Sequence, residues 1–170
     1  MRVYVPSTRP ALAAALRTGQ IGPPPVRAFA VTPALREWYA SGEDEELEYS
    51  AMTQAAGESL RLIAATPDAA PQRVVLAAEV PPDAVAPPGG GGYGTDLDHP
   101  ADILVDAVIP VSKVVSAHVD EPDAEGDIRA AADALEAADA GDDDARFTVD
   151  GAEGHELLWY AASELVHLFA

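Results

Sequence analysis

The sequence predicts an α/β fold: a single domain with a mixed sheet of about five strands, covered by about five helices. Short runs of β-branched residues alternate with segments whose apolar residues recur at helical spacing. A chain of 170 residues that is 48% hydrophobic is long enough to bury a core of its own. It contains no cysteine, which excludes disulfides and thiolate metal sites. We expect residues 1–170 to form one domain, with a flexible loop rich in proline and glycine at 81–101.

The first elements predict a strand, a helix and a second strand. Arg2–Val5 alternates apolar and polar residues before Pro6, and a helix with an apolar face follows as far as Gly19. The second strand covers Val26–Val31. Two strands joined by one helix typically lie parallel, so we expect a right-handed βαβ unit here.

Residues 32–65 predict two consecutive helices. Thr32-Pro33 is a typical helix start, and Leu35 and Trp38 share the side that we expect to face the core. Ser41-Gly42 ends this helix, and the four acids that follow favour the positive end of the next helix dipole. Its predicted buried rows are Leu47, Ala51, Ala55 and Ser59, and Met52, Ala56, Leu60 and Ile63.

The rest of the chain predicts further strands and helices. Arg73–Val80 is an apolar run typical of a central strand. Ile103–Ile109 and Val114–Val119 are expected to pair antiparallel through their short link, which would make the sheet mixed. Asp127–Ala138 is an alanine-rich helix and Arg146–Val149 a short edge strand. The last expected element is a single helix, residues 153–169, with a core face at Leu157, Leu158, Ala161, Leu165 and Leu168, and with Trp159 beside it.

The charge distribution argues against two classes of partner. The net charge is −19, but residues 1–41 hold five arginines and one acid, so residues 42–170 carry −23. Nucleic acid and anionic membranes repel such a surface, so we expect neither as a partner, and no stretch has the length of a membrane span. A cytoplasmic location is expected. A basic protein is the partner class that this surface favours.

No known catalytic or metal-binding pattern is complete. The glycine run 89–92 lacks the lysine and hydroxyl residue of a phosphate loop, and His155-Glu156 is followed by Trp159 where a zinc protease needs histidine. Glu164 and His167 have the spacing of a metal site in a helical bundle, but the second pair that such a site needs is missing. We therefore predict no metal and no cofactor.

One constellation remains, in the stretch from Val26 to Ala65. Arg36, Tyr39, Glu46 and Tyr49 are predicted to face one another across the Ser41-Gly42 turn, with Trp38 or Trp159 as the floor of a cleft. An arginine among aromatic residues suits an anionic or planar ligand. In the alternative interpretation Arg36 pairs with the acids after the turn and fixes the angle between two helices.

Several segments resemble a family of actinobacterial proteins of about this length, known as a domain of unknown function. These segments are MRVYVPST, AFAVTPALREWY, EELEYSAM, RVVLAAEVP, SAHVD, AGDDDARFTVDG and HELLWYAASEL. The resemblance covers nearly all of the chain except residues 87–100. It implies a single domain and carries over no catalytic residue.

These observations favour a binding or regulatory protein over an enzyme. The predicted mechanism is contact between the acidic surface and a basic protein partner. The alternative is a small enzyme or ligand-binding protein with a cleft around Arg36 and Trp159. The oligomeric state is not readable from the sequence.

Overall fold

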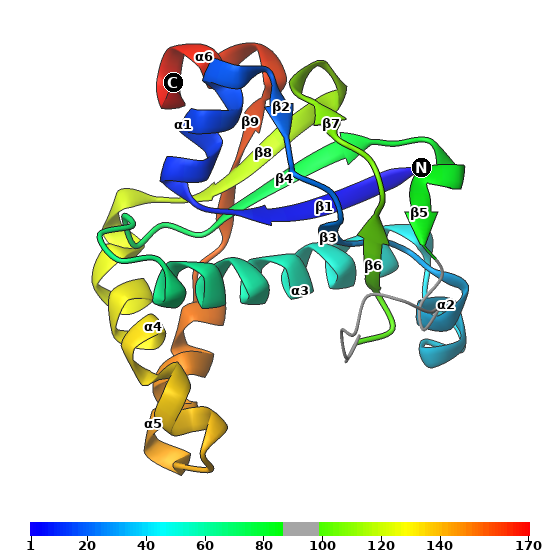
Figure 1. Ribbon diagram of the computed structural model, residues 1–170. Coiled ribbons are helices and arrows are strands. Elements are labelled where there is room, and N and C mark those ends of the chain that lie inside the picture. The colour runs from blue at the N-terminus through cyan, green and yellow to red at the C-terminus, as the bar shows by residue number, and fades with distance from the viewer. Residues whose placement is uncertain (87–98) are drawn as a thin grey trace.

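The computed structural model describes residues 1–86 and 99–170 (Figure 1). Its helices are α1 (Arg9–Thr18), α2 (Pro33–Trp38), α3 (Asp44–Ala65), α4 (Glu125–Asp139), α5 (Asp143–Asp150) and α6 (Ala162–Phe169). Its strands are β1 (Arg2–Ser7), β2 (Gln20–Ile21), β3 (Val26–Phe29), β4 (Val74–Glu79), β5 (Val85–Ala86), β6 (Asp102–Val105), β7 (Ile109–Pro110), β8 (Val114–Asp120) and β9 (Leu157–Ala161).

The predicted α/β single domain is confirmed, but its sheet differs in size and type. Seven strands form one sheet in the order β5-β6-β3-β1-β4-β8-β9, and β2 pairs with β7 separately. Every strand pair in the described residues is antiparallel, so the expectation of a mixed sheet is wrong.

The expected parallel βαβ unit at the start of the chain is also wrong. Strands β1 and β3 are antiparallel neighbours, joined in register at Tyr4 and Phe29. The reason lies in residues 20–25, which include β2. This segment carries the chain back to the end of the sheet where α1 began, so β3 runs opposite to β1.

The two strands expected to pair across a short link lie apart. Strand β6 pairs with β3 and β5, whereas β8 pairs with β4 and β9. The link between them contains β7, whose Ile109 pairs with Ile21 of β2. Because β7 bonds outside the main sheet, it carries the chain past β3, β1 and β4 before β8 begins.

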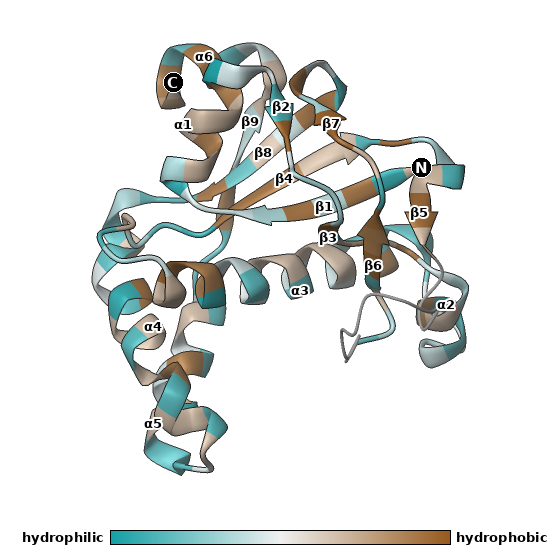
Figure 2. Ribbon diagram, viewed as in Figure 1, coloured by the Kyte–Doolittle hydropathy of each residue, from teal (hydrophilic) through white to brown (hydrophobic). Residues whose placement is uncertain are grey.

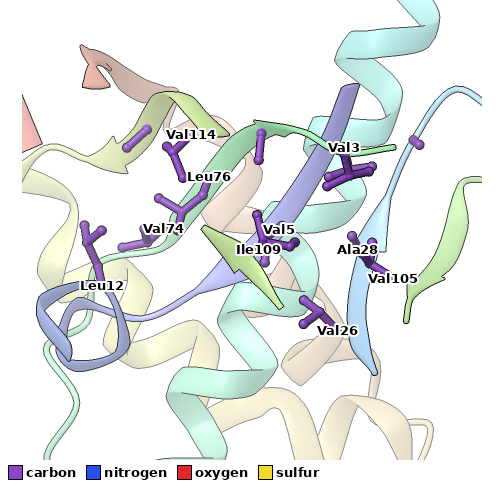
Figure 3. Packing of buried hydrophobic residues seen from close by; sticks show 14 of the residues in the cluster. Val3, Val5, Leu12, Val26, Ala28, Val74, Leu76, Val105, Ile109 and Val114 are labelled. Carbon is purple, nitrogen blue, oxygen red and sulfur yellow. The ribbon is translucent and has the colours of Figure 1, made fainter. Parts of the chain in front are cut away.

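Helices cover both faces of the sheet (Figure 1). On one face α3 packs on β1, β3 and β4, and its predicted rows are buried, with only Met52 half-exposed. On the other face Leu12 of α1 joins the valines of the central strands in one cluster (Figure 3), and Figure 2 shows the apolar character of these strands. Leu165 and Phe169 of α6 belong to the same cluster. Each fully buried leucine or valine contributes about 1.5–3 kcal/mol to folding. These two apolar layers therefore hold the sheet in place.

The predicted edge strand at 146–149 is instead part of helix α5. The Oδ1 atom of Asp142 accepts a hydrogen bond from the N–H of Ala145 at 3.0 Å, which caps the helix. Asp143 and Asp144 then occupy its first turn, where the helix dipole favours negative charge. The aspartate run thus starts a helix.

The predicted closing helix is two elements. Residues 157–161 form β9, the edge strand beside β8, and α6 begins after it, where the N–H of Ala161 donates to Oε2 of Glu164 at 2.8 Å. The predicted core face is therefore divided: Leu165 is buried, whereas Leu158 and Leu168 are 42% and 53% exposed. Trp38 of α2, also expected in the core, is 70% exposed.

Most of the predicted loop at 81–101 lies outside the described residues, since residues 87–98 are not described. In its described part, Pro82–Ala84 forms a single 3₁₀ turn and β5 pairs with β6.

Candidate ligand-binding cavity

A cavity of about 730 Å³ opens beside β1, between α1, the loop that precedes β3, and the second half of α3. Its apolar wall includes Val5, Ala14, Ile21, Val26, Leu62 and Val108. Its volume lies in the range of small-molecule sites, which are concave and mostly apolar with a few polar groups. We call it the apolar cavity.

The cavity exists because the sheet is open between β1 and β3. These strands are in register at Tyr4 and Phe29 alone, while β1 pairs with β4 along its whole length and β3 pairs with β6. Pro6 and Pro25 both lack a backbone N–H, so neither can donate to a ladder in this stretch. The two strands separate here, and the space between them is part of the cavity.

Small side chains on α1 keep this space open. Ala11, Ala14, Ala15 and Thr18 recur at helical spacing along one side of the helix, and all four line the cavity. Protein interiors are otherwise closely packed, so larger residues here would occupy the volume that the alanines leave.

One part of the lining is polar and charged. Arg27 of β3 donates from Nε and Nη2 to the two carboxylate oxygens of Asp102, at 3.1 and 3.2 Å. Its Nη1 lies 3.2 Å from Oε1 of Glu58 on α3. The side chain of Asp102 is 1% exposed, that of Glu58 19% and that of Arg27 36%. The guanidinium is thus held between two carboxylates.

A second cavity of about 450 Å³ lies over α3, and we call it the α3 groove. Its lining includes Tyr49, Thr53, Gly57, His99, Arg146 and Glu153, together with Arg27 and Glu58 of the apolar cavity. A Cβ at Gly57 would meet no atom within 4 Å, so packing does not require glycine there. The Arg27–Glu58 pair is therefore a wall common to both cavities.

His99 contributes a neutral imidazole to the α3 groove. Its Nδ1 accepts the N–H of Ala101 at 3.1 Å, and its own backbone N–H donates to Asp102. Burial lowers the pKa of His99, although the charge of Asp102 opposes this effect. Because Nδ1 is an acceptor, the ring proton of the neutral form lies on Nε2.

The sequence model of DUF6912, a family of unknown function, matches residues 1–169. The chain belongs to DUF6912. No curated protein and no solved structure matches it. The expected membership of a domain family of unknown function is thus confirmed, and for this DUF6912 chain the function must be argued from the site.

The structure places Arg36 at the surface, outside both cavities. Its Nη1 donates to Oδ1 of Asp44 at 2.8 Å, and the two side chains are 55% and 76% exposed. This ion pair joins α2 to the first turn of α3, which is the geometry of the alternative interpretation. Tyr39 ends α2, and its hydroxyl oxygen accepts a 3.5 Å hydrogen bond from Ser50.

The other three predicted residues are dispersed. Glu46 is exposed in the first turn of α3, and only Tyr49 lines a cavity, the α3 groove. Trp159 lies on the edge strand β9, with β8, β4 and β1 between it and β3. The structure therefore does not place it beside Arg36.

The prediction from sequence missed the residues that line the apolar cavity. The available signal was the row of small residues at 11, 14, 15 and 18, which leaves one side of α1 without a large side chain.

Among the described residues no cluster of three or more His, Asp or Glu has the geometry of a metal site. No helix in ranges 1–86 and 99–170 has the length and apolarity to cross a membrane.

Proposed function

We propose that this DUF6912 protein is a non-catalytic binding protein, and that the apolar cavity holds a small amphipathic molecule. The observation that carries the proposal is a mostly apolar volume of about 730 Å³ with one charged wall, at Arg27 and Glu58. The ligand's apolar body would replace solvent against Val5, Val26 and Leu62, which gains about 25 cal/mol per Å² of apolar surface. Its polar end would lie at the charged wall.

Binding of the neutral apolar dye N-phenyl-1-naphthylamine tests the proposal. We expect the dye's fluorescence to rise on saturable binding to the wild type. Ala14→Phe fills the cavity from α1 and should weaken binding at least tenfold, and Thr18→Phe does the same from an exposed position of that helix. Ala130→Phe is the matched control, since Ala130 is exposed on α4 and lines neither cavity. Equal binding by all four folded proteins would refute the proposed site.

A second candidate function is contact with a basic protein through the α4–α5 hairpin, which extends away from the sheet (Figure 1). Phe147 of α5 is 81% exposed, and Asp142, Asp143, Asp144 and Asp150 belong to the same short segment. An exposed aromatic residue within acidic surroundings suits a basic partner with an apolar pocket. This is the specific form of the acidic-surface hypothesis that the fold supports.

Pull-down from a native lysate at low and moderate salt tests this candidate. A basic partner should bind to the wild type at low salt. Phe147→Ser should abolish this binding, whereas Trp38→Ser, which removes an exposed aromatic residue of α2 outside the hairpin, should retain it. The candidate fails if the captured proteins are the same with and without Phe147.

Two broader parts of the proposal rest on composition. The high alanine content and the predominance of arginine over lysine support an actinobacterial origin. The sequence has no cysteine, so no disulfide requires an oxidising compartment, and this agrees with the proposed cytoplasmic location. Cell fractionation with an antibody to the protein tests the location.

A further inference from the structure

We infer that the ligand of the apolar cavity carries a cationic head, an ammonium group, which binds to the carboxylate of Glu58. This inference rests on the proposed function, because it identifies the class of molecule that the same cavity takes. Four observations lead to it: the charge balance at the polar wall, the two carboxylates already beside Arg27, the free hydrogen-bonding capacity of Glu58, and the charge of the whole chain.

The polar wall has one negative charge more than it has positive charges. Glu58 and Asp102 are two carboxylates that share the single guanidinium of Arg27. Arg61 also interacts with Glu58 by charge, but it is itself paired with Asp139, so three carboxylates face two guanidinium groups. His99, the nearest further titratable group in contact with Asp102, donates to it from the backbone and not from its ring. A bound cation would complete the balance of charge.

Arg27 already has a carboxylate on each side, Asp102 and Glu58. Its Nε and Nη2 are held by Asp102, whose side chain is 1% exposed, and its Nη1 faces Glu58. An anionic head that reached the remaining N–H groups of this guanidinium would lie beside Glu58 or Asp102, at the cost of like-charge repulsion. The geometry therefore disfavours fatty-acid-like ligands.

The carboxylate of Glu58 can accept further hydrogen bonds. Its side chain is only 19% exposed, yet no described residue donates a hydrogen bond to either of its carboxylate oxygens; its 3.2 Å contact with Arg27 is an ion pair. A partly buried carboxylate gains most from a charged donor, since such bonds are roughly twice as strong as neutral ones. An ammonium group provides up to three N–H donors.

The net charge of the chain also favours a cationic ligand. A protein of net charge −19 attracts cations and repels anions, and a cleft with apolar walls focuses this field. An amphipathic amine is therefore favoured in approach as well as in the site. An alkyl or aryl body would lie between α1 and α3, where the lining is Val5, Ala14, Val26 and Leu62.

Displacement of the dye by three ligands with the same eight-carbon chain tests the inference at pH 7. These are octylamine, 1-octanol and octanoate, which differ in the head group alone: a cationic ammonium, a neutral hydroxyl and an anionic carboxylate. We expect octylamine to bind at least tenfold more tightly than octanol, and octanoate to bind most weakly. In Glu58→Gln, octylamine and octanol should become equal within about twofold. Added salt should weaken octylamine alone, because its head is the part that interacts by charge.

The matched control is Glu48→Gln, which removes an exposed acid of α3 outside both cavities and should keep the preference for the amine. Equal affinity for octylamine and octanol in the wild type, tightest binding of octanoate, or an unchanged preference in Glu58→Gln would each overturn the cationic head while leaving the cavity as a binding site. If neither the dye nor any of the three ligands binds, the proposed function itself fails.

Discussion

Two arginines of this protein each join a pair of neighbouring strands through a buried aspartate, and they differ in how completely they are bound. Arg73, just before β4, donates to Asp120 of β8 from its backbone N–H, Nε and Nη2, each at 2.8 Å, and Nη2 also reaches the carbonyl of His155. Arg27 of β3 meets Asp102 of β6 at 3.1 and 3.2 Å. The side chain of Arg73 is 5% exposed, against 36% for Arg27.

The difference separates a structural ion pair from one at a binding site. Asp120 is fully used by Arg73 and is 0% exposed, and Arg73, although it lines the α3 groove, is only 5% exposed. Arg27 lies at the wall between two cavities, where its second carboxylate partner, Glu58, is accessible. Buried charge is expensive unless it is completely paired, so the complete pair belongs in the core and the incomplete pair at a cavity.

Removal of the carboxylate from the complete pair should have the largest effect. Asp120→Ala leaves the guanidinium of Arg73 buried without a counter-charge, and it also leaves the backbone N–H of Arg73 without its acceptor. Breaking such a pair typically costs 3–5 kcal/mol, so we expect a loss of about this size in the free energy of unfolding. Urea denaturation followed by circular dichroism measures it. A loss below about 1 kcal/mol would remove the distinction between the two pairs.

Removal of the carboxylate from the incomplete pair should cost less. In Asp102→Ala, water can reach the 36% exposed side chain of Arg27, and Glu58 remains as a counter-charge. We expect a loss of about 1–3 kcal/mol, typical of a broken hydrogen bond with a charged group. The same urea titration compares the two variants directly. A loss as large as that of Asp120→Ala would show that both pairs are structural.

Helix α3 and the main strands of the sheet were predictable because their signals are local. The acids before Leu47 and the apolar rows behind them follow the 3.6-residue period over five turns, and β4 is a continuous apolar run. Strand pairing was not predictable in the same way, because it depends on where distant segments meet. β2 and β7 are two residues each, too short for a periodic signal, yet they direct the chain between strands.

The site was less predictable than the fold. Arg36, Tyr39 and Trp159 drew attention as charged or aromatic residues, but at a surface such residues satisfy one another or face water. The cavity depends on what is missing: a ladder between β1 and β3 beyond the pair Tyr4 and Phe29, and large side chains on α1. Arg27 could not be distinguished from other early arginines, since Asp102 and Glu58 lie far from it in sequence and meet it only in the folded chain.

Acidification should lower the free energy of unfolding, and part of this loss should come from His99, which donates to Asp102, the partner of Arg27. Burial lowers the pKa of His99 below its ordinary value, so the folded protein holds the ring neutral while the unfolded chain protonates near pH 6.5. The unfolded state therefore binds more protons below that pH, and stability should fall as the pH goes from 7.5 to 5.5. We expect His99→Gln to reduce this fall, as judged from urea midpoints at both values.

His118 provides the control for this measurement. Burial lowers its pKa as well, so it adds to the fall in stability in the same direction, but it lies on β8 away from Arg27. His118→Gln should reduce the fall independently, and the double variant should show the sum of both effects. If His99→Gln leaves the pH dependence of wild type unchanged, the ring of His99 is not held neutral by burial.

Among these substitutions, Glu58→Gln should have the smallest effect on the free energy of unfolding. Glu58→Gln keeps the size of the side chain and removes a 3.2 Å ion pair whose other member remains bound to Asp102. Partly exposed pairs contribute about 1 kcal/mol or less, so the urea midpoint should change little. The same substitution should abolish the preference for octylamine over octanol. A residue that is nearly neutral for folding and decisive for the ligand belongs to a binding site; a large loss of stability would instead make the Arg27–Glu58 pair, like Arg73–Asp120, part of the structure.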